Sequence, residues 1–464
     1  MIRLIRVLAA LVLVVSACGT ATQQQAQPET STSIVSPTTV AASVAPATST
    51  TMTTQPSATQ APPTTEPPPQ VRTGAQVLAD SSFSQLAGLR VGLIAHQNSV
   101  VQVEDVQIHL SDAMVATDDV ELVALFGPEH GVRGTADAGE LVEDEVDPET
   151  GLPVFSLFGN TRQPTPEMLE GIDVLVYDLQ DVGTRYYTYI STMGLAMQAA
   201  ANEGIGFVVL DRPNPLGGAI GGGVLEVERT SFVGQYPIPD QYGLTAGELA
   251  LQIVEHEWLS GLDGLDLDVV TADGWTRDML WPETGLEWIA PSPAIDTVES
   301  ALLYPATIWF EASAMSYGRG TDEPFRVLGA PWLDADAAAN ELRERSLPGV
   351  TFETTEVTPT SAGLTVEPAF VDQTIPAVRI RVEDPSVVEA TELGVHLLDV
   401  MSTQANAAGA TFLSRPAWLD QLSGNALLRS VVESGAIDVD AVVEAQELQR
   451  LDGAAQLSDG LLYE

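Results

Sequence analysis

The sequence predicts an α/β fold in which an open parallel sheet forms the first domain and a smaller α+β domain follows. The expected strands are short, continuous apolar runs, which is typical of parallel strands covered on both faces. Helix-like stretches stand between these runs, and such alternation indicates right-handed crossover connections. From about residue 298 the pattern changes to helical stretches mixed with alternating strands.

The N-terminus has the pattern of a lipoprotein signal peptide. Two arginines precede an apolar run at 8–15, which is too short for a stable membrane-spanning helix. VSAC at 15–18 then reads as a lipobox, and Cys18 is the only cysteine of the chain. Lipidation explains a lone cysteine in an exported protein, although a cleaved signal with an incidental cysteine is the alternative. We therefore expect an extracytoplasmic protein that Cys18 anchors to the outer face of the cell membrane.

The chain after residue 18 is expected to have three parts. Residues 19–70 are almost wholly Thr, Ser, Pro, Gln, Ala and Val, a composition that buries too little apolar surface to fold. They are expected to form a disordered tether. Residues 71–297 are assigned to a catalytic sheet domain and 298–464 to the smaller domain, with no linker to mark the boundary.

The elements of the first domain follow the apolar pattern. Strands are expected at 89–96, 120–126, 174–177, 206–210 and 265–270. Helices are expected at 106–117, 165–171, 191–203 and 245–258; the third ends at Gly204, and the fourth begins with a Thr245–Glu248 capping box. This order indicates a Rossmann-like sheet. In the second domain, helices are expected at 335–345, 389–404 and 417–434, and strands at 350–356 and 377–382.

The chain is strongly acidic, with a net charge of −45 from 64 acidic and 19 basic residues, and every basic residue is an arginine. Such a surface repels nucleic acid, so no nucleic-acid partner is expected. Solubility in a salty or acidic exterior is the simplest interpretation of the acidity. An arginine in a loop motif of this chain is expected to have a specific anionic partner, which can be a structural carboxylate.

Three of the expected strands end in polar clusters: GPEHG at 127–131, DLQDVGTRY at 178–186 and DRPNP at 211–215. Ligands of an open parallel sheet bind outside the carboxyl ends of the strands, so these clusters are expected to share one crevice. Carboxylates, a histidine and arginines there suit acid/base hydrolysis. The residues concerned are Glu129, His130, Asp178, Asp181, Arg185, Asp211, Arg212 and Asn214.

Structural roles remain open for several of these residues. Asp211 can serve as a helix N-cap, Asp178 and Asp181 can pair with Arg185, and His130 can hydrogen-bond a loop. The turn around Glu129 does not by itself require a carboxylate. The chain lacks the lysine of a Walker loop, HExxH, a Cys/His zinc set and GxSxG, whereas Asp/Glu/His metal sites stay possible.

Several long strings resemble the exo-β-N-acetylmuramidase family, from about Val71 to Glu464. They include LFGPEHGVRG (125–134), IDVLVYDLQDVGTRYYTYISTM (172–193), VVLDRPNPLGG (208–218) and YGRGTDEPFRVLGAPW (317–332). The resemblance implies a Rossmann-like domain, a smaller second domain and an active-site cleft near their junction. It also implies release of N-acetylmuramic acid (MurNAc) from the non-reducing ends of peptidoglycan fragments in wall recycling, without a metal or organic cofactor. The expected substrates are MurNAc-GlcNAc saccharides, where GlcNAc is N-acetylglucosamine.

The resemblance makes Glu129 the favoured catalytic candidate, and we expect His130, Asp178 and Asp181, which lie in the matched strings, to take part in catalysis. Glu129 is expected to be the general acid/base, His130 to assist it, and an aspartate from 178, 181 or 211 to act as base or to orient the N-acetyl group. Substrate binding is expected from Gln180, Arg185, Tyr186, Tyr189, Asp211, Arg212, Asn214 and Arg319. One of the arginines 185, 212 or 319 is expected to hold the lactyl carboxylate of MurNAc.

The chain departs from the family pattern at two places. Tyr242 stands where the family often has histidine, and Glu311-Ala312-Ser313-Ala314 stands where it often has Glu-Gly-Thr-Asn. Two other functions stay open: a non-catalytic lipoprotein that binds muropeptides or sugars, and a metal-free hydrolase of an ester or amide. Oligomeric state and stereochemical course are not assigned from the sequence.

Overall fold

The computed structural model describes residues 70–464 except 135, 137–139, 141–142, 363 and 458–459. The predicted signal peptide, Cys18 and almost all of the predicted tether therefore lie outside the described residues. None of the described helices combines the length and apolarity that crossing a membrane requires.

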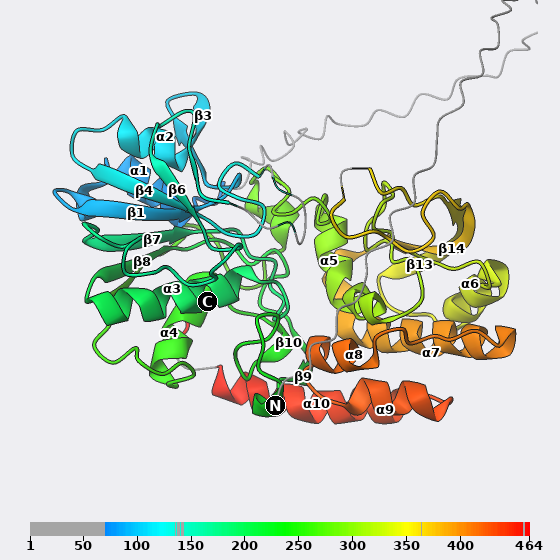
Figure 1. The fold of residues 1–464 in the computed structure, drawn as a ribbon. Helices are drawn as coiled ribbons and strands as arrows, with labels where there is room; N and C mark the ends of the chain where they lie inside the picture. Colours follow the sequence, from blue (N-terminus) through cyan, green and yellow to red (C-terminus); the bar gives the residue numbers. More distant parts are fainter. Residues whose placement is uncertain (1–69, 135, 137–139, 141–142, 363, 458–459) are drawn as a thin grey trace, which may run out of the picture. The chain divides into compact units, whose positions relative to one another are not determined.

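The first domain is built on a seven-stranded sheet with the order β11-β8-β7-β1-β4-β6-β5 (Figure 1). Its strands are β1 (Arg90–Ala95), β4 (Glu121–Gly127), β5 (Glu145–Val146), β6 (Pro153–Ser156), β7 (Val174–Asp178), β8 (Gly206–Leu210) and β11 (Leu267–Val270). Neighbouring strands are parallel except β5, which is antiparallel to β6. Without β5 this is the 3-2-1-4-5-6 order of a Rossmann fold, so the predicted fold class is confirmed.

Helices cover both faces of this sheet, which explains the continuous apolar strands. Helices α1 (Gly74–Asp80) and α2 (Leu110–Val115) lie on one face, and α3 (Tyr189–Glu203) and α4 (Ala246–Glu255) lie on the other (Figure 1). Successive side chains of a strand point to opposite faces of the sheet. In β1, Leu93 packs in the core under α1 and α2, and Ile94 packs in the core under α3 and α4. Both sides of each central strand must therefore be apolar.

Local signals at two helix ends are confirmed. Helix α3 ends at Gly204, which adopts φ +68°. Helix α4 begins with both hydrogen bonds of the capping box between Thr245 and Glu248. These bonds satisfy backbone N–H groups that the helix itself leaves without partners.

Three of the predicted helices are wrong in extent or kind. Residues 106–117 begin with strand β3 (Val106–His109), which pairs with β2 (Val100–Val103) through a turn at Glu104 (φ +56°), and only then form α2. Residues 165–171 form successive turns, because prolines at 164 and 166 and Gly171 at φ +84° leave room for no helix. Residues 417–434 form two helices, α8 (Pro416–Leu422) and α9 (Leu427–Ser434).

The break between α8 and α9 falls at Gly424, which adopts φ +76°. A Cβ atom at this position would lie 2.9 Å from the Leu225 Cα and from Nη2 of Arg185. Glycine is therefore required both by the backbone conformation and by the close approach of the first domain.

The second domain contains a three-stranded antiparallel sheet, in the order β12-β14-β13, and packed helices (Figure 1). Its other elements are α5 (Val298–Thr307), η4 (Ile308–Ala312), β12 (Val327–Gly329), α6 (Ala335–Glu344), β13 (Val350–Val357), β14 (Ile375–Val382), α7 (Ala390–Ala408) and α10 (Val439–Gln456). Between the domains stands the hairpin β9 (Ile220–Val224) and β10 (Pro239–Tyr242).

The C-terminal segment returns to the first domain. Helix α10 packs against β9 and β10 and is the red helix of Figure 1. Beyond it, the Tyr463 hydroxyl donates a 2.6 Å hydrogen bond to Asp211, and the Arg277 N–H donates a 2.8 Å bond to the Glu464 carbonyl. These contacts help to hold the two domains together.

Candidate active site

A cavity of about 430 Å³ lies at the domain junction, where the family resemblance implies a cleft. We call it the junction cleft. The first domain contributes Glu129, Phe158, Arg162, Tyr186, Thr188 and Phe232 to its lining, and the second contributes Tyr304, Glu311, Arg319 and Trp418. A second cavity of about 80 Å³ shares Glu129, Thr188, Tyr304 and Arg319 with it, so the two spaces adjoin. We call this smaller space the inner pocket.

Glu129 lies in the loop after β4 and is half-buried. Its Oε2 accepts a 3.0 Å hydrogen bond from the Thr188 hydroxyl, at the start of α3. The Tyr189 hydroxyl contacts the Glu129 carbonyl at 3.3 Å and the Pro291 carbonyl at 2.8 Å. Strands β4 and β7 flank β1, so the loops that follow them meet at the carboxyl edge of the sheet. This topology positions the Glu129 carboxylate.

His130 is buried beside Glu129 and adopts φ +78°, a conformation that is rare for residues other than glycine. Its Nδ1 donates a 3.0 Å hydrogen bond to the Ala136 carbonyl, which places a proton on that nitrogen. Backbone strain of this kind persists where the surroundings enforce it, commonly at functional sites. His130 thus shapes the turn that carries Glu129.

Aromatic side chains surround the carboxylate. Tyr187 packs edge-to-face on Tyr189 at 4.8 Å between ring centroids, and Tyr304 packs in the same way on Tyr186 at 5.4 Å and on Phe325 at 4.7 Å. Burial raises the pKa values of the Tyr187, Tyr189 and Tyr304 hydroxyls well above their ordinary value, so these groups stay neutral. Such a wall offers apolar faces and hydrogen-bonding edges, which suits a sugar ring.

Glu311 is the second carboxylate in the lining of the junction cleft. It lies on η4, its side chain is 20% exposed, and Arg415 Nη2 is 3.7 Å from its Oε1. The sequence analysis noted Glu311 only as part of a departure from the family pattern. Its place just before the YGRGT string is the one signal that points to it, because that string supplies Arg319 to the same cleft.

Arg319 borders both the junction cleft and the inner pocket. Its Nε donates a 3.2 Å hydrogen bond to the Tyr317 hydroxyl. Among the described residues, no carboxylate oxygen lies within 4 Å of the Arg319 guanidinium. Arg185 and Arg212, in contrast, each form an ion pair with an aspartate. Of the three arginines expected to bind a lactyl carboxylate, Arg319 is thus the one placed to do so.

The other predicted site residues form a separate buried network. Asp178 and Arg212 make a two-point ion pair, at 2.6 and 2.9 Å, with exposed fractions of 0% and 6%. Asp211 accepts hydrogen bonds from Thr245 Oγ1 at 2.7 Å, the Gly247 N–H at 2.8 Å and Tyr463, and so holds the start of α4. The Asp178 and Asp211 carboxylates thus have hydrogen-bond partners within the protein.

Arg185 is also buried, where it pairs with Asp240 on β10 and donates to the Leu422 carbonyl. Asp181 accepts bonds from the Gly183 N–H and the Tyr242 hydroxyl, and burial raises the pKa of its carboxyl to about 7.

The side-chain amides of Gln180 and Asn214 complete this buried network. Gln180 donates to the carbonyls of Asp181 and Pro213, and Asn214 donates to that of Leu244.

The predicted site residues do not all border one cavity. Glu129, His130, Tyr186, Tyr189 and Arg319 border the junction cleft or the inner pocket, whereas Asp178, Gln180, Asp181, Arg185, Asp211, Arg212 and Asn214 border neither. Of the charged residues among them, Asp178 pairs with Arg212 and Arg185 pairs with Asp240, whereas Asp181 and Asp211 are held by neutral hydrogen-bond donors. Among the described residues, no three His, Cys, Asp or Glu side chains are grouped to hold a metal ion.

The chain is similar to known proteins over most of its length. The family models for the N-terminal and C-terminal domains of exo-β-N-acetylmuramidase NamZ match residues 91–299 and 302–451. The peptidoglycan β-N-acetylmuramidase NamZ of Bacillus subtilis (strain 168) is 41% identical over 380 residues, which cover 82% of this chain and 88% of that protein.

Two crystal structures of DUF1343 family proteins from Bacteroides fragilis NCTC 9343 share the fold. Their TM-scores are 0.76 and 0.69, and their sequence identities are 37% and 28%. In each comparison 85% of this chain and 99% of the other chain are covered.

Proposed function

Because the chain belongs to the NamZ family of exo-β-N-acetylmuramidases, we propose that it is a glycosidase that releases MurNAc from the non-reducing ends of peptidoglycan fragments. The observation that carries this proposal is the position of Glu129, which Thr188 holds in a cleft that also contains Glu311 and Arg319. A carboxylic acid, a second carboxylate and a cation for the lactyl group are the parts that this reaction needs.

Glu129 is assigned as the general acid. It gives a proton to the glycosidic oxygen as the bond from C1 of MurNAc to that oxygen breaks. A water molecule forms the new bond to C1, and its proton passes to Glu311 as general base. No electrons are transferred to or from a cofactor in this scheme. Asp178 and Asp181 are assigned to support of the surrounding loops, because Asp178 pairs with Arg212 and Asp181 accepts a bond from the Gly183 N–H.

Arg319 is assigned to the lactyl carboxylate of the terminal MurNAc. A guanidinium can bind a carboxylate through two parallel hydrogen bonds. GlcNAc has no lactyl group and would leave the hydrogen-bond donors of Arg319 without a carboxylate in a partly desolvated site. We expect the site to discriminate against GlcNAc because its binding would desolvate the Arg319 guanidinium without supplying a carboxylate to pair with it.

The location of the protein is also a proposal. We propose that the mature chain is attached to the outer face of the cell membrane through a lipid on Cys18. A flexible chain of the length of segment 19–70 has an rms span of about 40 Å, enough to let the folded part reach toward the wall. Replacement of Cys18 by serine tests this: the wild-type protein is expected in the membrane fraction, and the variant outside it. Equal distribution of both would contradict the anchor.

Substrate selectivity tests the proposed function. The purified protein is offered a chromogenic β-MurNAc glycoside and the matching β-GlcNAc glycoside. We expect hydrolysis of the first, and a kcat/KM at least about 100-fold lower for the second, because removal of one buried charge partner costs several kcal/mol. Binding of MurNAc-GlcNAc without hydrolysis would instead indicate a non-catalytic binding protein.

A further inference from the structure

Arg162 is a cation without an anionic partner in a very acidic protein. Every described arginine except Arg162, Arg319 and Arg343 has a carboxylate oxygen within 4 Å. Arg343 is occupied otherwise, since it donates to the Phe352 carbonyl at 2.8 Å and to Asn340 Oδ1 at 2.6 Å. The two remaining arginines both border the junction cleft.

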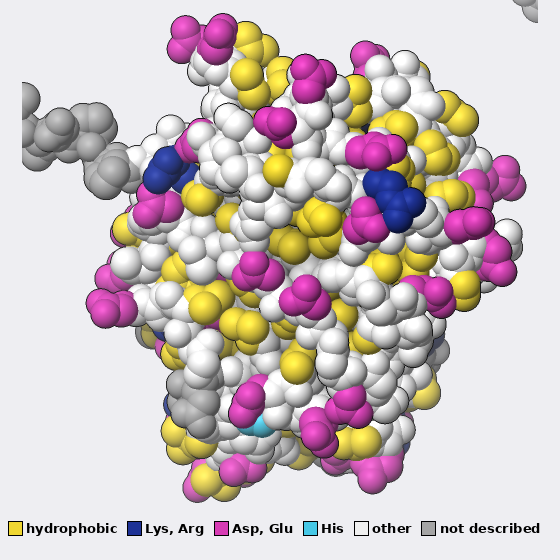
Figure 2. Space-filling view, turned by 90° about the vertical axis from the view of Figure 1, so that its left-hand side faces the viewer, with side chains coloured by type: hydrophobic (Ala, Val, Ile, Leu, Met, Phe, Trp, Pro, Cys, Tyr) yellow, Lys and Arg dark blue, Asp and Glu magenta, His cyan; other side chains and the backbone are white. Residues whose placement is uncertain are grey.

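The lack of a carboxylate within 4 Å of Arg162 and Arg319 is notable because acidic groups are abundant in this protein. The chain has 64 acidic residues for 19 arginines. Figure 2 shows one face of the molecule, on which acidic side chains are widely spread and basic ones are few. An arginine that neutralised only its own protein would find a carboxylate easily here, so the two cleft arginines are available to a ligand.

Two phenylalanines hold the Arg162 guanidinium in place. Its Cζ lies 4.1 Å from the Phe232 ring centroid and 5.6 Å from that of Phe158, and the two rings are 6.3 Å apart. The ring faces attract the cation, and the guanidinium N–H donors make no hydrogen bond within the described residues. Both phenylalanines are half-buried, whereas Arg162 is exposed. We call these three residues the Arg162 platform.

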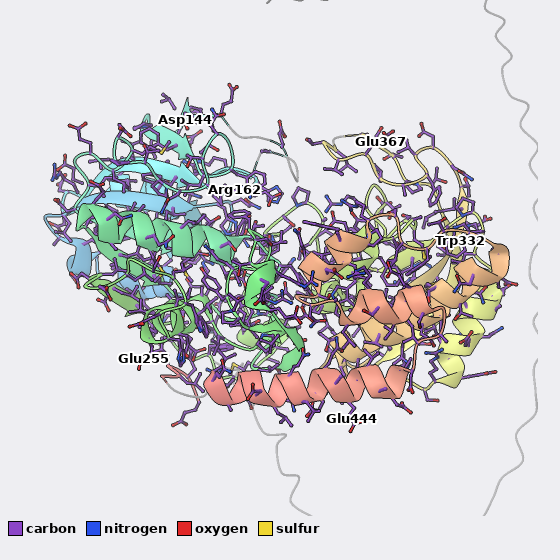
Figure 3. The ribbon with its side chains drawn as sticks, turned by 60° about the horizontal axis from the view of Figure 1, so that its bottom comes forward. Asp144, Arg162, Glu255, Trp332, Glu367 and Glu444 are labelled. Carbon is purple, nitrogen blue, oxygen red and sulfur yellow. The ribbon has the colours of Figure 1, made fainter. Side chains whose placement is uncertain are left out.

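The platform lies nearer the solvent than Arg319 does. Arg319 borders the inner pocket together with Glu129, and Arg162 does not. In Figure 3, Arg162 lies on the side of the sheet domain toward the second domain. An exo-acting enzyme encloses the terminal sugar next to its acid and leaves the rest of the saccharide toward solvent. The platform therefore borders the outer part of the junction cleft, outside the inner pocket.

We propose that the Arg162 platform binds a carboxylate on the second muramic acid of the substrate, outside the sugar that is released. This inference rests on the proposed function and deepens it. The carboxylate has two sources, the free lactyl group of a bare glycan or an acidic residue of an attached peptide. In both cases the guanidinium edge pairs with the anion while the phenylalanine rings contact the apolar part of the ligand.

Kinetics on matched substrates tests the platform. The purified protein and its Arg162→Gln variant are given the chromogenic β-MurNAc glycoside, the tetrasaccharide MurNAc-GlcNAc-MurNAc-GlcNAc and the analogue MurNAc-GlcNAc-GlcNAc-GlcNAc. We expect the variant to lose about tenfold more kcat/KM on the tetrasaccharide than on the other two, mainly through KM. The peptide-bearing tetrasaccharide, run in parallel, tells the two carboxylate sources apart, since the larger loss identifies the preferred one.

Arg450→Gln is the matched control, because it removes the same charge from an exposed Arg450–Glu447 pair on α10. The control is expected to treat all substrates as the wild-type protein does. The inference would be overturned if Arg162→Gln lowered kcat/KM equally on all substrates, or lowered it on none of them.

Binding separates failure of this inference from failure of the proposed function. Calorimetric titration of the tetrasaccharide into Glu129→Gln, with and without Arg162→Gln, is expected to give a Kd about tenfold higher in the double variant. If the wild-type protein hydrolysed no MurNAc substrate but this difference remained, the proposed function would fail and the platform would stand. If hydrolysis proceeded and Kd did not change, the platform alone would fail.

Discussion

The hydroxyl of Thr188 donates a 3.0 Å hydrogen bond to Oε2 of Glu129. Thr188 occupies the N-cap position of α3, where a threonine side chain ordinarily accepts a bond from the first turn of the helix, yet it makes no such bond. The Thr188 side chain therefore hydrogen-bonds the Glu129 carboxylate and does not cap the backbone of α3. This use of a capping residue links the start of α3 to the loop after β4 and keeps Glu129 directed into the cleft.

Thr188→Val is expected to lower kcat about tenfold and to leave thermal stability nearly unchanged. A carboxylate that this bond no longer orients is expected to lose about 1.4 kcal/mol of transition-state stabilisation, which corresponds to a factor of about ten in rate. No cap bond is lost, so the helix is not weakened. Steady-state kinetics and a thermal melt measure both effects. Thr188→Ser retains the hydroxyl and serves as the control; an equal loss of kcat in both variants would contradict the proposed contact.

Glu311→Gln is expected to lower kcat at least about 100-fold on MurNAc-GlcNAc, because general-base catalysis contributes about that much or more. The control is Glu444→Gln, a change on the exposed side of α10 that Figure 3 labels. A loss below about threefold would exclude Glu311 as the base and favour participation of the substrate's own N-acetyl group.

Arg185→Met is expected to reduce the free energy of unfolding by about 3–5 kcal/mol. Arg185 and Asp240 are both fully buried, so removal of the cation leaves a buried carboxylate without its partner. Urea unfolding measures the change. The double variant Arg185→Met/Asp240→Leu is expected to recover part of the loss, since neither charge remains. A double variant as unstable as the sum of the two single variants would indicate that the residues do not interact.

Asp181→Asn is expected to make stability less dependent on pH between about 4 and 7. Burial raises the pKa of Asp181 from 3.8 to about 7, so the folded protein holds this proton to higher pH than the unfolded chain does. The free energy of unfolding therefore falls as pH rises through this window, by up to about 1.4 kcal/mol per pH unit for one proton. Asparagine does not titrate, although it can still accept bonds from Tyr242 and Gly183.

Urea unfolding at pH 5 and pH 8 compares the slopes of the wild-type protein, Asp181→Asn and the exposed control Asp452→Asn. Identical slopes for the wild-type protein and Asp181→Asn would show that Asp181 is ionised in the folded state throughout this range.

The sequence predicts the sheet well because its signals are local. Covered strands are apolar throughout, and the capping box at Thr245 needs only neighbouring residues. The helix expected at 165–171 is wrong because two prolines and a glycine outweigh a short apolar pattern. The sequence places the polar clusters at strand ends but does not show which of their side chains face solvent. Asp178 and Arg212 satisfy each other in the interior, whereas Glu129 is turned into the cleft.

The residues that the second domain brings to the site are harder to predict. Glu311 lies far from Glu129 in the chain, and only packing of the two domains places both in one cavity. Arg162 follows no expected strand and belongs to no motif, so its stacking on Phe232 is visible only in the folded protein.

Release of MurNAc by the wild-type protein and by Glu129→Gln tests the central claim most directly. Both are incubated with MurNAc-GlcNAc, and the free sugars are measured by mass spectrometry, with calorimetry to show that the variant still binds the disaccharide. We predict release by the wild-type protein and a rate at least about 1,000-fold lower for the variant, within the range that a positioned acid contributes. A variant that releases MurNAc at the wild-type rate would contradict the account.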